Sequence, residues 1–204
     1  MTDERFEVIL FDLGGVLVEF DGITPLLALS GNTLTREQAR RFWLLSSAVR
    51  RFETGRCNGE EFAVAAVAEL KFNIAPDLFL QQFVSWDRGP MPGALELLDL
   101  LKPRFFLACL SNNNELHWRR LREETGLLGR FHRCFASQEI GHMKPDRESF
   151  DHVIRDLGVA PDHILFLDDN PECVEGARVA GLVASCAQGV DGVRTALASF
   201  GIAL

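Results

Sequence analysis

The 204-residue sequence has no apolar run approaching the roughly 18 residues of a membrane-spanning helix. Met1 to Arg5 show no basic segment followed by an apolar stretch, so we expect a cytoplasmic protein without a secretory signal. Positive charge is not in excess either, because 21 Lys and Arg stand against 29 Asp and Glu, a formal net charge of -8. This balance argues against nucleic acid and anionic membranes as partners.

Cysteine pairs with metal-binding or redox spacing are also missing. The five cysteines are odd in number, widely scattered and never arranged as C-x-x-C. This pattern indicates neither a disulfide framework nor a zinc site. A chain of this length buries roughly 70% of its unfolded surface on folding, so its core needs no metal. Any bound metal would therefore serve a function.

Short apolar runs, each ending in polar residues, alternate with helical patterning along the chain. Continuous apolar runs suit strands that are covered on both faces, so the pattern predicts an α/β fold with a parallel sheet. The predicted strands cover residues 8–11, 105–110 and 164–167, with weaker candidates at 134–136 and 182–184.

A long insertion separates the first two predicted strands, and its patterning is helical throughout. Thr35-x-x-Gln38 has the spacing of a capping box, and Asn58-x-x-Glu61 is a related helix start. We therefore expect residues 16–89 to form a separate helical unit.

Other helix signals lie between the later strands. Pro92 stands where a first helical turn can begin. Asp146 can cap a helix that ends at Gly158, and Asn170 opens another that closes at Gly181. These helices would cover the sheet.

Polar residues follow the predicted strands. The first strand ends at Asp12, the second at Ser111 and Asn112, and a later one at Asp168 and Asp169. In an open parallel sheet, ligands bind beyond the carboxyl ends of the strands, so these residues should converge. Taken alone, each has an ordinary reading as a turn residue.

A divalent cation fits the three carboxylates. Asp12, Asp168 and Asp169 would repel one another and raise their pKa values unless a cation neutralised them, and oxygen ligands of this kind suit Mg²⁺. Gly14 and Gly15 would let a main-chain carbonyl approach closely.

A phosphoryl pocket could lie beside that cation. Ser111 and the amide of Asn112 can donate hydrogen bonds to a phosphoryl group, and Lys144 beside Asp12 would offset charge on both nucleophile and phosphate. The ordinary alternatives are a strand-end turn and a solvated loop lysine.

Four motifs in this order resemble those of the haloacid dehalogenase-like hydrolase superfamily, and the resemblance spans essentially the whole chain. They are Phe11–Leu17 (FDLGGVL), Leu110–Asn112 (LSN), Met143–Pro145 (MKP) and Phe166–Asn170 (FLDDN). The resemblance implies a Rossmann-like, three-layer parallel core formed by residues 1–15 and 90–204, with residues 16–89 as an inserted helical cap.

The resemblance also implies residue roles. Asp12 would attack phosphorus to give an aspartyl-phosphate, Ser111 would hold the phosphoryl oxygens, and Lys144 would anchor nucleophile and phosphate. Mg²⁺ would be bound by Asp12 and Asp169, by Asp168 directly or through water, and by the Gly14 carbonyl.

One position departs from the family pattern. Most family phosphatases carry a second Asp two residues after the nucleophile, which protonates the leaving oxygen, and this chain has Gly14 there. The sequence instead resembles a subgroup that includes alpha-glucose-1-phosphate phosphatases. The general acid is left unidentified; Glu19 and Asp21 could supply the proton, or could be solvated loop carboxylates.

Substrate choice is expected to reside in the helical insertion. The segment 50–56 is cationic and contains a glycine, and it resembles the family position that faces the site. Arg51 and Arg56 are therefore candidate substrate-binding residues, together with Asn112 and Gly14. A solvated helix end is the alternative reading of the segment.

Three functions remain open at this point. The first is a Mg²⁺-dependent phosphatase for a small phosphorylated metabolite, with sugar phosphates among the candidates. The second is a dehalogenase in which Asp12 attacks carbon, although that group usually has an aromatic residue at the position of Gly14. The third is a non-catalytic phosphate-binding protein. Magnesium-dependent turnover separates the first from the others.

Overall fold

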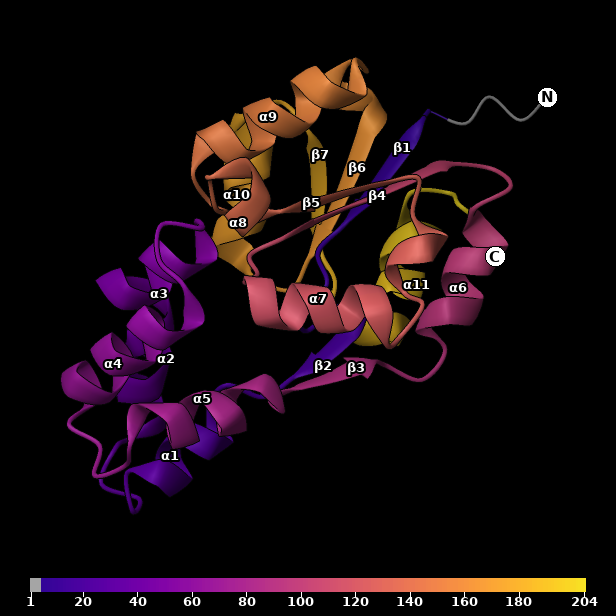
Figure 1. Cartoon of the computed structure of the whole chain (residues 1–204). Helices are drawn as coiled ribbons and strands as arrows, with labels where there is room; N and C mark the ends of the chain where they lie inside the picture. The colour runs from indigo at the N-terminus through magenta and orange to yellow at the C-terminus, as the bar shows by residue number, and fades with distance from the viewer. Residues whose placement is uncertain (1–4) are drawn as a thin grey trace.

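The computed structural model describes residues 5–204, so residues 1–4 of the predicted core segment lie outside the described residues. A five-stranded parallel sheet forms the centre of the molecule, in the order β5-β4-β1-β6-β7 (Figure 1). All five predicted strands are confirmed. They are β1 (Val8–Phe11), β4 (Phe106–Ser111), β5 (Arg133–Ala136), β6 (Ile164–Asp168) and β7 (Val183–Cys186).

Helices cover both faces of this sheet, which explains the uninterrupted apolar runs. Ile9 and Phe11 of β1 belong to one core cluster, whereas Val8 and Leu10 belong to the other, as the two-residue period of a strand requires. The first cluster includes residues of α6 (Ala94–Leu101), α7 (Glu115–Glu123) and α11 (Gly189–Ser199), and the second includes residues of α9 (Arg147–Leu157) and α10 (Pro171–Val179). The result is the expected three-layer, Rossmann-like core.

A second group of helices packs around its own aromatic core beside the sheet (Figure 1). Its helices are α1 (Thr24–Leu29), α2 (Arg36–Leu45), α3 (Ser47–Glu53), α4 (Gly59–Leu70) and α5 (Pro76–Val84), called here the helical unit. Both predicted helix starts form capping boxes, at Thr35 for α2 and at Asn58 for α4. Phe52 and Phe62 stack with ring centroids 4.6 Å apart, which joins α3 to α4.

The ends of the insertion are strands, where the sequence pattern predicted helix. β2 (Val18–Phe20) and β3 (Asp87–Pro90) pair antiparallel where the chain leaves the core and returns to it. Three- and four-residue strands are too short to establish an alternating pattern. Val18 is also buried in a cluster of the main core, so this ribbon connects the two parts of the molecule.

The remaining helices begin close to the predicted positions. α6 begins at Ala94 after Gly93, two residues later than the Pro92 signal, and α10 follows its Asn170 cap and ends at Val179. α9 begins after Asp146, but this side chain makes no capping hydrogen bond because it pairs with Arg50. The shorter helices are α8 (Ser137–Ile140), η1 (Leu128–Arg130) and η2 (Pro161–His163). Within residues 5–204, no helix has the length and apolar character needed to cross a bilayer.

Candidate active site

Three acidic side chains meet at the carboxyl end of the sheet. Asp12 follows β1, Asp168 ends β6, and Asp169 comes next in the chain. β1 and β6 are parallel neighbours in register, so their ends lie side by side. One carboxylate oxygen from each residue lies within 4.8 Å of the others, which confirms the predicted convergence.

The environment of these carboxylates disfavours their charge. Burial raises the pKa of Asp12 to about 7, with Lys144 acting against the shift and Asp168 reinforcing it. Burial, followed by the neighbouring Asp168, raises the pKa of Asp169 as well. A hard cation with oxygen ligands would offset this repulsion, so the donor set fits Mg²⁺.

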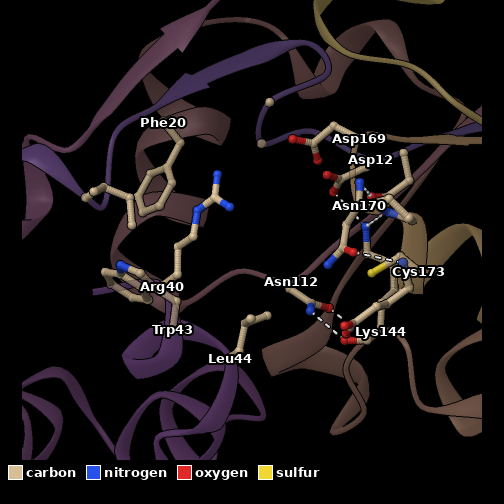
Figure 2. A pocket seen from close by; sticks show the side chains of 16 residues that line it. Asp12, Phe20, Arg40, Trp43, Leu44, Asn112, Lys144, Asp169, Asn170 and Cys173 are labelled. Carbon is tan, nitrogen blue, oxygen red and sulfur yellow. Dashed lines mark hydrogen bonds and ion pairs between the residues drawn. The ribbon is translucent and has the colours of Figure 1, made fainter. Parts of the chain in front are cut away.

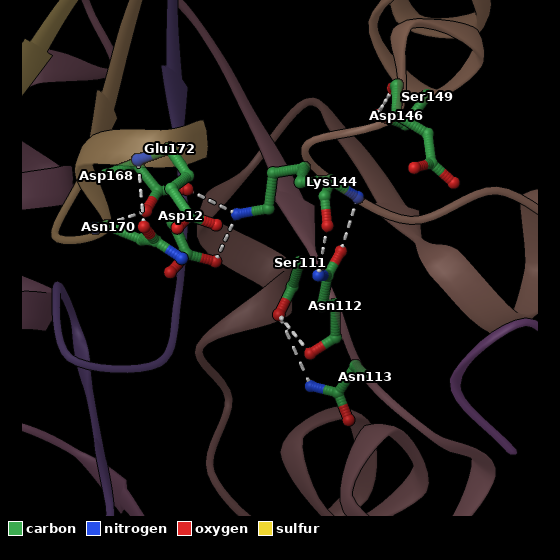
Figure 3. A network of polar contacts seen from close by, with 10 residues as sticks. All are labelled: Asp12, Ser111, Asn112, Asn113, Lys144, Asp146, Ser149, Asp168, Asn170 and Glu172. Carbon is green, nitrogen blue, oxygen red and sulfur yellow. Dashed lines mark hydrogen bonds and ion pairs between the residues drawn. The ribbon is translucent and has the colours of Figure 1, made fainter. Parts of the chain in front are cut away.

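Lys144 supplies a positive charge to the cluster. Its Nζ lies 2.7 Å from Oδ1 of Asp12 and 2.6 Å from Oδ2 of Asp168, and its side chain is 2% exposed (Figure 3). Burial alone would lower the pKa of Lys144, but the two carboxylates outweigh burial and raise it. The ammonium group is therefore held charged between the two acids.

Asn112 fixes the loop that carries this lysine. Its Nδ2 donates to the Lys144 carbonyl oxygen and its Oδ1 accepts from the Lys144 backbone N–H, each at 2.8 Å (Figure 3). The Asn112 side chain is thus committed to the loop. Its backbone N–H can still donate to a ligand, and that role stays a prediction from the sequence.

The Ser111 hydroxyl is weakly engaged. Its nearest polar partners, the Asn112 carbonyl oxygen and Asn113 Nδ2, are each 3.5 Å away. Hydrogen bonds of that length are weak, so the hydroxyl can turn toward a ligand. Ser111 ends β4, the strand beside β1, which places it next to the acidic cluster.

The two glycines of the first motif differ. Gly15 has a φ of +75°, and a Cβ there would overlap the Asp169 carboxylate. A Cβ on Gly14 would meet nothing within 4 Å. Gly15 therefore provides the close approach of main chain and carboxylate, whereas Gly14 opens space above the motif.

A cavity of about 490 Å³ lies over the acidic cluster. Asp12 and Lys144 line it from the sheet side, and Arg40 and Trp43 of α2 line it from the helical unit (Figure 2). Gly14 also lines this cavity. Neither Arg40 nor Trp43 was predicted from the sequence as a site residue. The Thr35 capping box indicated where α2 begins, but nothing local indicates which face of α2 turns toward the sheet.

Arg51 and Arg56 lie elsewhere. Both side chains are exposed, and neither is among the residues that line the 490 Å³ cavity. Arg56 lines a separate hollow with Gln138, and Arg51 lies close enough to Cys57 to affect its pKa. The structure therefore does not bring these arginines to Asp12.

The two proposed proton donors from the sequence also lie outside the cavity. Glu19 forms an exposed ion pair with Arg88 at 2.7 Å. Asp21 accepts hydrogen bonds from the backbone amides of Ile23 and Thr24. Neither carboxylate is among the residues that line the cavity over the acidic cluster.

One carboxylate near the cluster was not singled out from the sequence. Glu53 ends α3 and lines a small cavity of about 70 Å³ together with Gly14 and Ser111. Burial raises the pKa of Glu53 to about 7, opposed by Lys144 and reinforced by Asp12. The sequence feature that could have indicated Glu53 is its position within segment 50–56, which was expected to face the site.

Comparison with known proteins finds related hydrolases by sequence and by fold. Phosphatase MT3486 of Mycobacterium tuberculosis (strain CDC 1551 / Oshkosh) is 29% identical over 218 residues, which cover 96% of this chain and 95% of that protein. The fold is similar to that of the HAD family enzyme BT-2542 of Bacteroides thetaiotaomicron in complex with magnesium and inorganic phosphate. That structure has a TM-score of 0.74 and 22% identity, covering 90% of this chain and 94% of the other.

The fold is also similar to that of L-2-haloacid dehalogenase of Xanthobacter autotrophicus with chloropropionic acid covalently bound. Here the TM-score is 0.65 with 23% identity, covering 98% of this chain and 85% of the other. The family model for haloacid dehalogenase-like hydrolases matches residues 6–181, a range that includes all four motifs and the acidic cluster. The chain therefore belongs to the haloacid dehalogenase-like hydrolases.

Proposed function

We propose that this protein is a Mg²⁺-dependent phosphatase that hydrolyses a small phosphorylated metabolite through an aspartyl-phosphate on Asp12. The observation that carries the proposal is the cluster of Asp12, Asp168 and Asp169, with Lys144 bonded to two of its members. The 29% identity to a mycobacterial protein named as a phosphatase supports the same reaction class.

Mg²⁺ would be held by carboxylate oxygens of Asp12, Asp168 and Asp169 and by the Gly14 carbonyl. Asp168 is the most constrained of these ligands, because its Oδ1 already accepts from the Asn170 amide at 2.8 Å and its Oδ2 from Lys144. When bound, the ion would offset the carboxylate charge and polarise a phosphoryl oxygen.

The residues of the chain would do the remaining work. A carboxylate oxygen of Asp12 attacks phosphorus, the bond from phosphorus to the leaving oxygen breaks, and water then cleaves the aspartyl-phosphate to release phosphate. The Ser111 hydroxyl and the Asn112 backbone amide donate to the phosphoryl oxygens. Lys144 favours the ionised form of the Asp12 carboxylate against the effect of burial, and it offsets charge on the phosphoryl group.

The helical unit would act as a cap that recognises the organic part of the substrate, with residues 16–89 as the cap and residues 1–15 and 90–204 as the core. Arg40 and Trp43 reach the cavity from this unit (Figure 2). The cavity volume of about 490 Å³ suits a small molecule. A cationic side chain beside an aromatic ring fits a polar or anionic organic part, and sugar phosphates belong to this class.

A screen of phosphorylated metabolites with and without Mg²⁺ tests the proposal. We expect turnover that is lost on chelation and abolished in Asp12→Asn, because the amide is a poor nucleophile. Turnover that survives Asp12→Asn would contradict the proposal. Binding of Mg²⁺ and phosphate without turnover would identify a phosphate-binding protein instead.

Including 2-haloacids in the same screen tests the second reaction class. The fold similarity to L-2-haloacid dehalogenase extends over 98% of this chain. However, attack on carbon requires no divalent ion, so a dehalogenase would not need a cluster of three carboxylates to bind one. Halide release that does not depend on Mg²⁺ would identify a dehalogenase.

A further inference from the structure

The proposed reaction needs a proton donor for the leaving oxygen, and the first motif provides none. Gly14 has no side chain, and the space in which its Cβ would lie is open. A cavity of about 70 Å³ occupies this region and is lined by Gly14, Ser111 and Asn112 from the core. It adjoins the 490 Å³ cavity, because Gly14 and Asn112 line both.

Glu53, the last residue of α3 in the helical unit, also lines this small cavity. We propose that Glu53 is the general acid and general base of the reaction, supplied by the helical unit across the space above Gly14. The inference rests on the proposed phosphatase function. It assigns the proton transfer to a residue of α3 rather than to the loop carboxylates Glu19 and Asp21.

The position of Glu53 is fixed by contacts on both sides of it in the sequence. Arg50, one turn earlier on α3, forms an ion pair with Asp146 at the start of α9. Gly55, two residues later, packs against the backbone carbonyl of Gln138 in α8, where a Cβ would collide. The end of α3 is therefore docked onto the core, with Glu53 between the two contacts.

The Glu53 carboxyl group is free to react. Throughout residues 5–204, no side-chain hydrogen bond or ion pair engages it, although the residue is half-buried. A carboxyl group with a structural role would normally have such a partner when removed from water.

The electrostatic surroundings favour proton transfer near neutral pH. Burial raises the pKa of Glu53 to about 7, Lys144 lowers it and Asp12 raises it. Of the other titratable groups that line the small cavity, Asp87 of β3 accepts from the Gly89 amide, and His117 of α7 is bonded to the Phe83 carbonyl oxygen. Both side chains are held by hydrogen bonds to backbone groups, whereas Glu53 can exchange a proton near neutral pH.

The proton balance of the two steps is complete. As Asp12 bonds to phosphorus, the leaving oxygen takes the proton of the Glu53 carboxyl group and departs as an alcohol. The Glu53 carboxylate then takes a proton from water as the water oxygen bonds to phosphorus. The bond from phosphorus to Asp12 breaks, which releases phosphate and restores the Asp12 carboxylate and the protonated Glu53 carboxyl group.

The test compares an alkyl phosphate with p-nitrophenyl phosphate in Glu53→Gln, which is isosteric but cannot transfer the proton. Nitrophenolate leaves without a proton, so its phosphorylation step should survive while hydrolysis of the aspartyl-phosphate slows. We expect a burst of nitrophenol equivalent to the enzyme, followed by slow turnover. For the alkyl phosphate we expect about a 100-fold or greater loss of kcat and no burst.

Controls separate this inference from the proposed function and from misfolding. Glu60→Gln, an exposed carboxylate on α4, should match the wild type on both substrates. The burst amplitude counts folded active sites, and Glu53→Ala provides a second variant with the same expected outcomes. An equal loss in the rate of the phosphorylation step on both substrates would overturn the acid role of Glu53. Turnover of p-nitrophenyl phosphate at the wild-type rate without a burst would overturn its base role. A wild-type protein without any phosphatase activity would overturn the proposed function itself.

Discussion

Gly15 shows how a single residue sets the geometry of the acidic cluster. Its positive φ and the contact with Asp169 leave no room for a Cβ, so the first motif and the end of β6 approach closely only with glycine at this position. The same approach brings the carboxylates of Asp12, Asp168 and Asp169 together. The close packing of main chain against carboxylate therefore belongs to the proposed metal site.

We predict that Gly15→Ala weakens Mg²⁺ binding about 10-fold or more, because Asp169 must move away from its two neighbours. Titration calorimetry with Mg²⁺ measures this effect. Gly158→Ala is the matched control, since Gly158 has a similar φ of +65° but open space around its Cβ position. Both variants bear the cost of the left-handed backbone, about 1 kcal/mol of stability. Equal Mg²⁺ affinity in the two variants would show that the overlap with Asp169 is unimportant.

At the scale of elements, the sequence predicted the sheet and its polar strand ends well. Asp12, Ser111 and Asp168 directly follow or end apolar runs, so local pattern and parallel topology together place them. Arg40 and Glu53 could not be placed in this way. They reach the site only through the docking of α2 and α3, which depends on contacts distant in sequence, such as the ion pair of Arg50 with Asp146.

Helix α2 provides a test of the substrate side of the cavity. We predict that Arg40→Ala raises KM about 10-fold for substrates with an anionic or polar organic part, because a charged hydrogen bond is worth about 1.5 kcal/mol or more. The kcat should change little, since Arg40 would bind ground state and transition state alike. Arg41→Ala is the matched control, because this exposed neighbour on α2 does not line the cavity. A KM that is equally raised in both variants would count against a specific contact from Arg40.

At the scale of the whole molecule, His117 joins the core to the helical unit. This buried residue of α7 contacts the Phe83 carbonyl oxygen of α5 through Nε2 at 2.8 Å and Asn114 through Nδ1 at 3.1 Å. Its ring also packs against Phe83, with centroids 4.4 Å apart. Burial lowers the pKa of His117 to about 4, with the Phe83 bond acting against the shift and Arg120 reinforcing it.

A neutral His117 in the folded state makes stability depend on pH. The unfolded chain gains the proton below about pH 6.5, whereas the folded chain gains it only near pH 4. The contribution of neutral His117 to the free energy of unfolding is therefore complete above pH 6.5 and is lost as the pH falls toward 4. We predict that the free energy of unfolding falls by on the order of 2 kcal/mol between pH 7 and pH 5 through this group alone. Urea unfolding at both pH values measures it.

His117→Gln should remove that part of the pH dependence, because Gln keeps polar atoms but does not titrate. His163→Gln is the control, since His163 is exposed and paired with Glu7, which raises its pKa instead. If His117→Gln and the wild type lose the same stability between pH 7 and pH 5, the buried neutral state of His117 is wrong.

Mass spectrometry of enzyme quenched in acid during turnover can detect the aspartyl-phosphate proposed on Asp12. We expect a phosphoryl group on the peptide that contains Asp12, formed only when Mg²⁺ is present, absent from Asp12→Asn, and accumulating in Glu53→Gln. Steady hydrolysis of a phosphate monoester with no phosphoryl group on that peptide in any of these proteins would contradict this proposal.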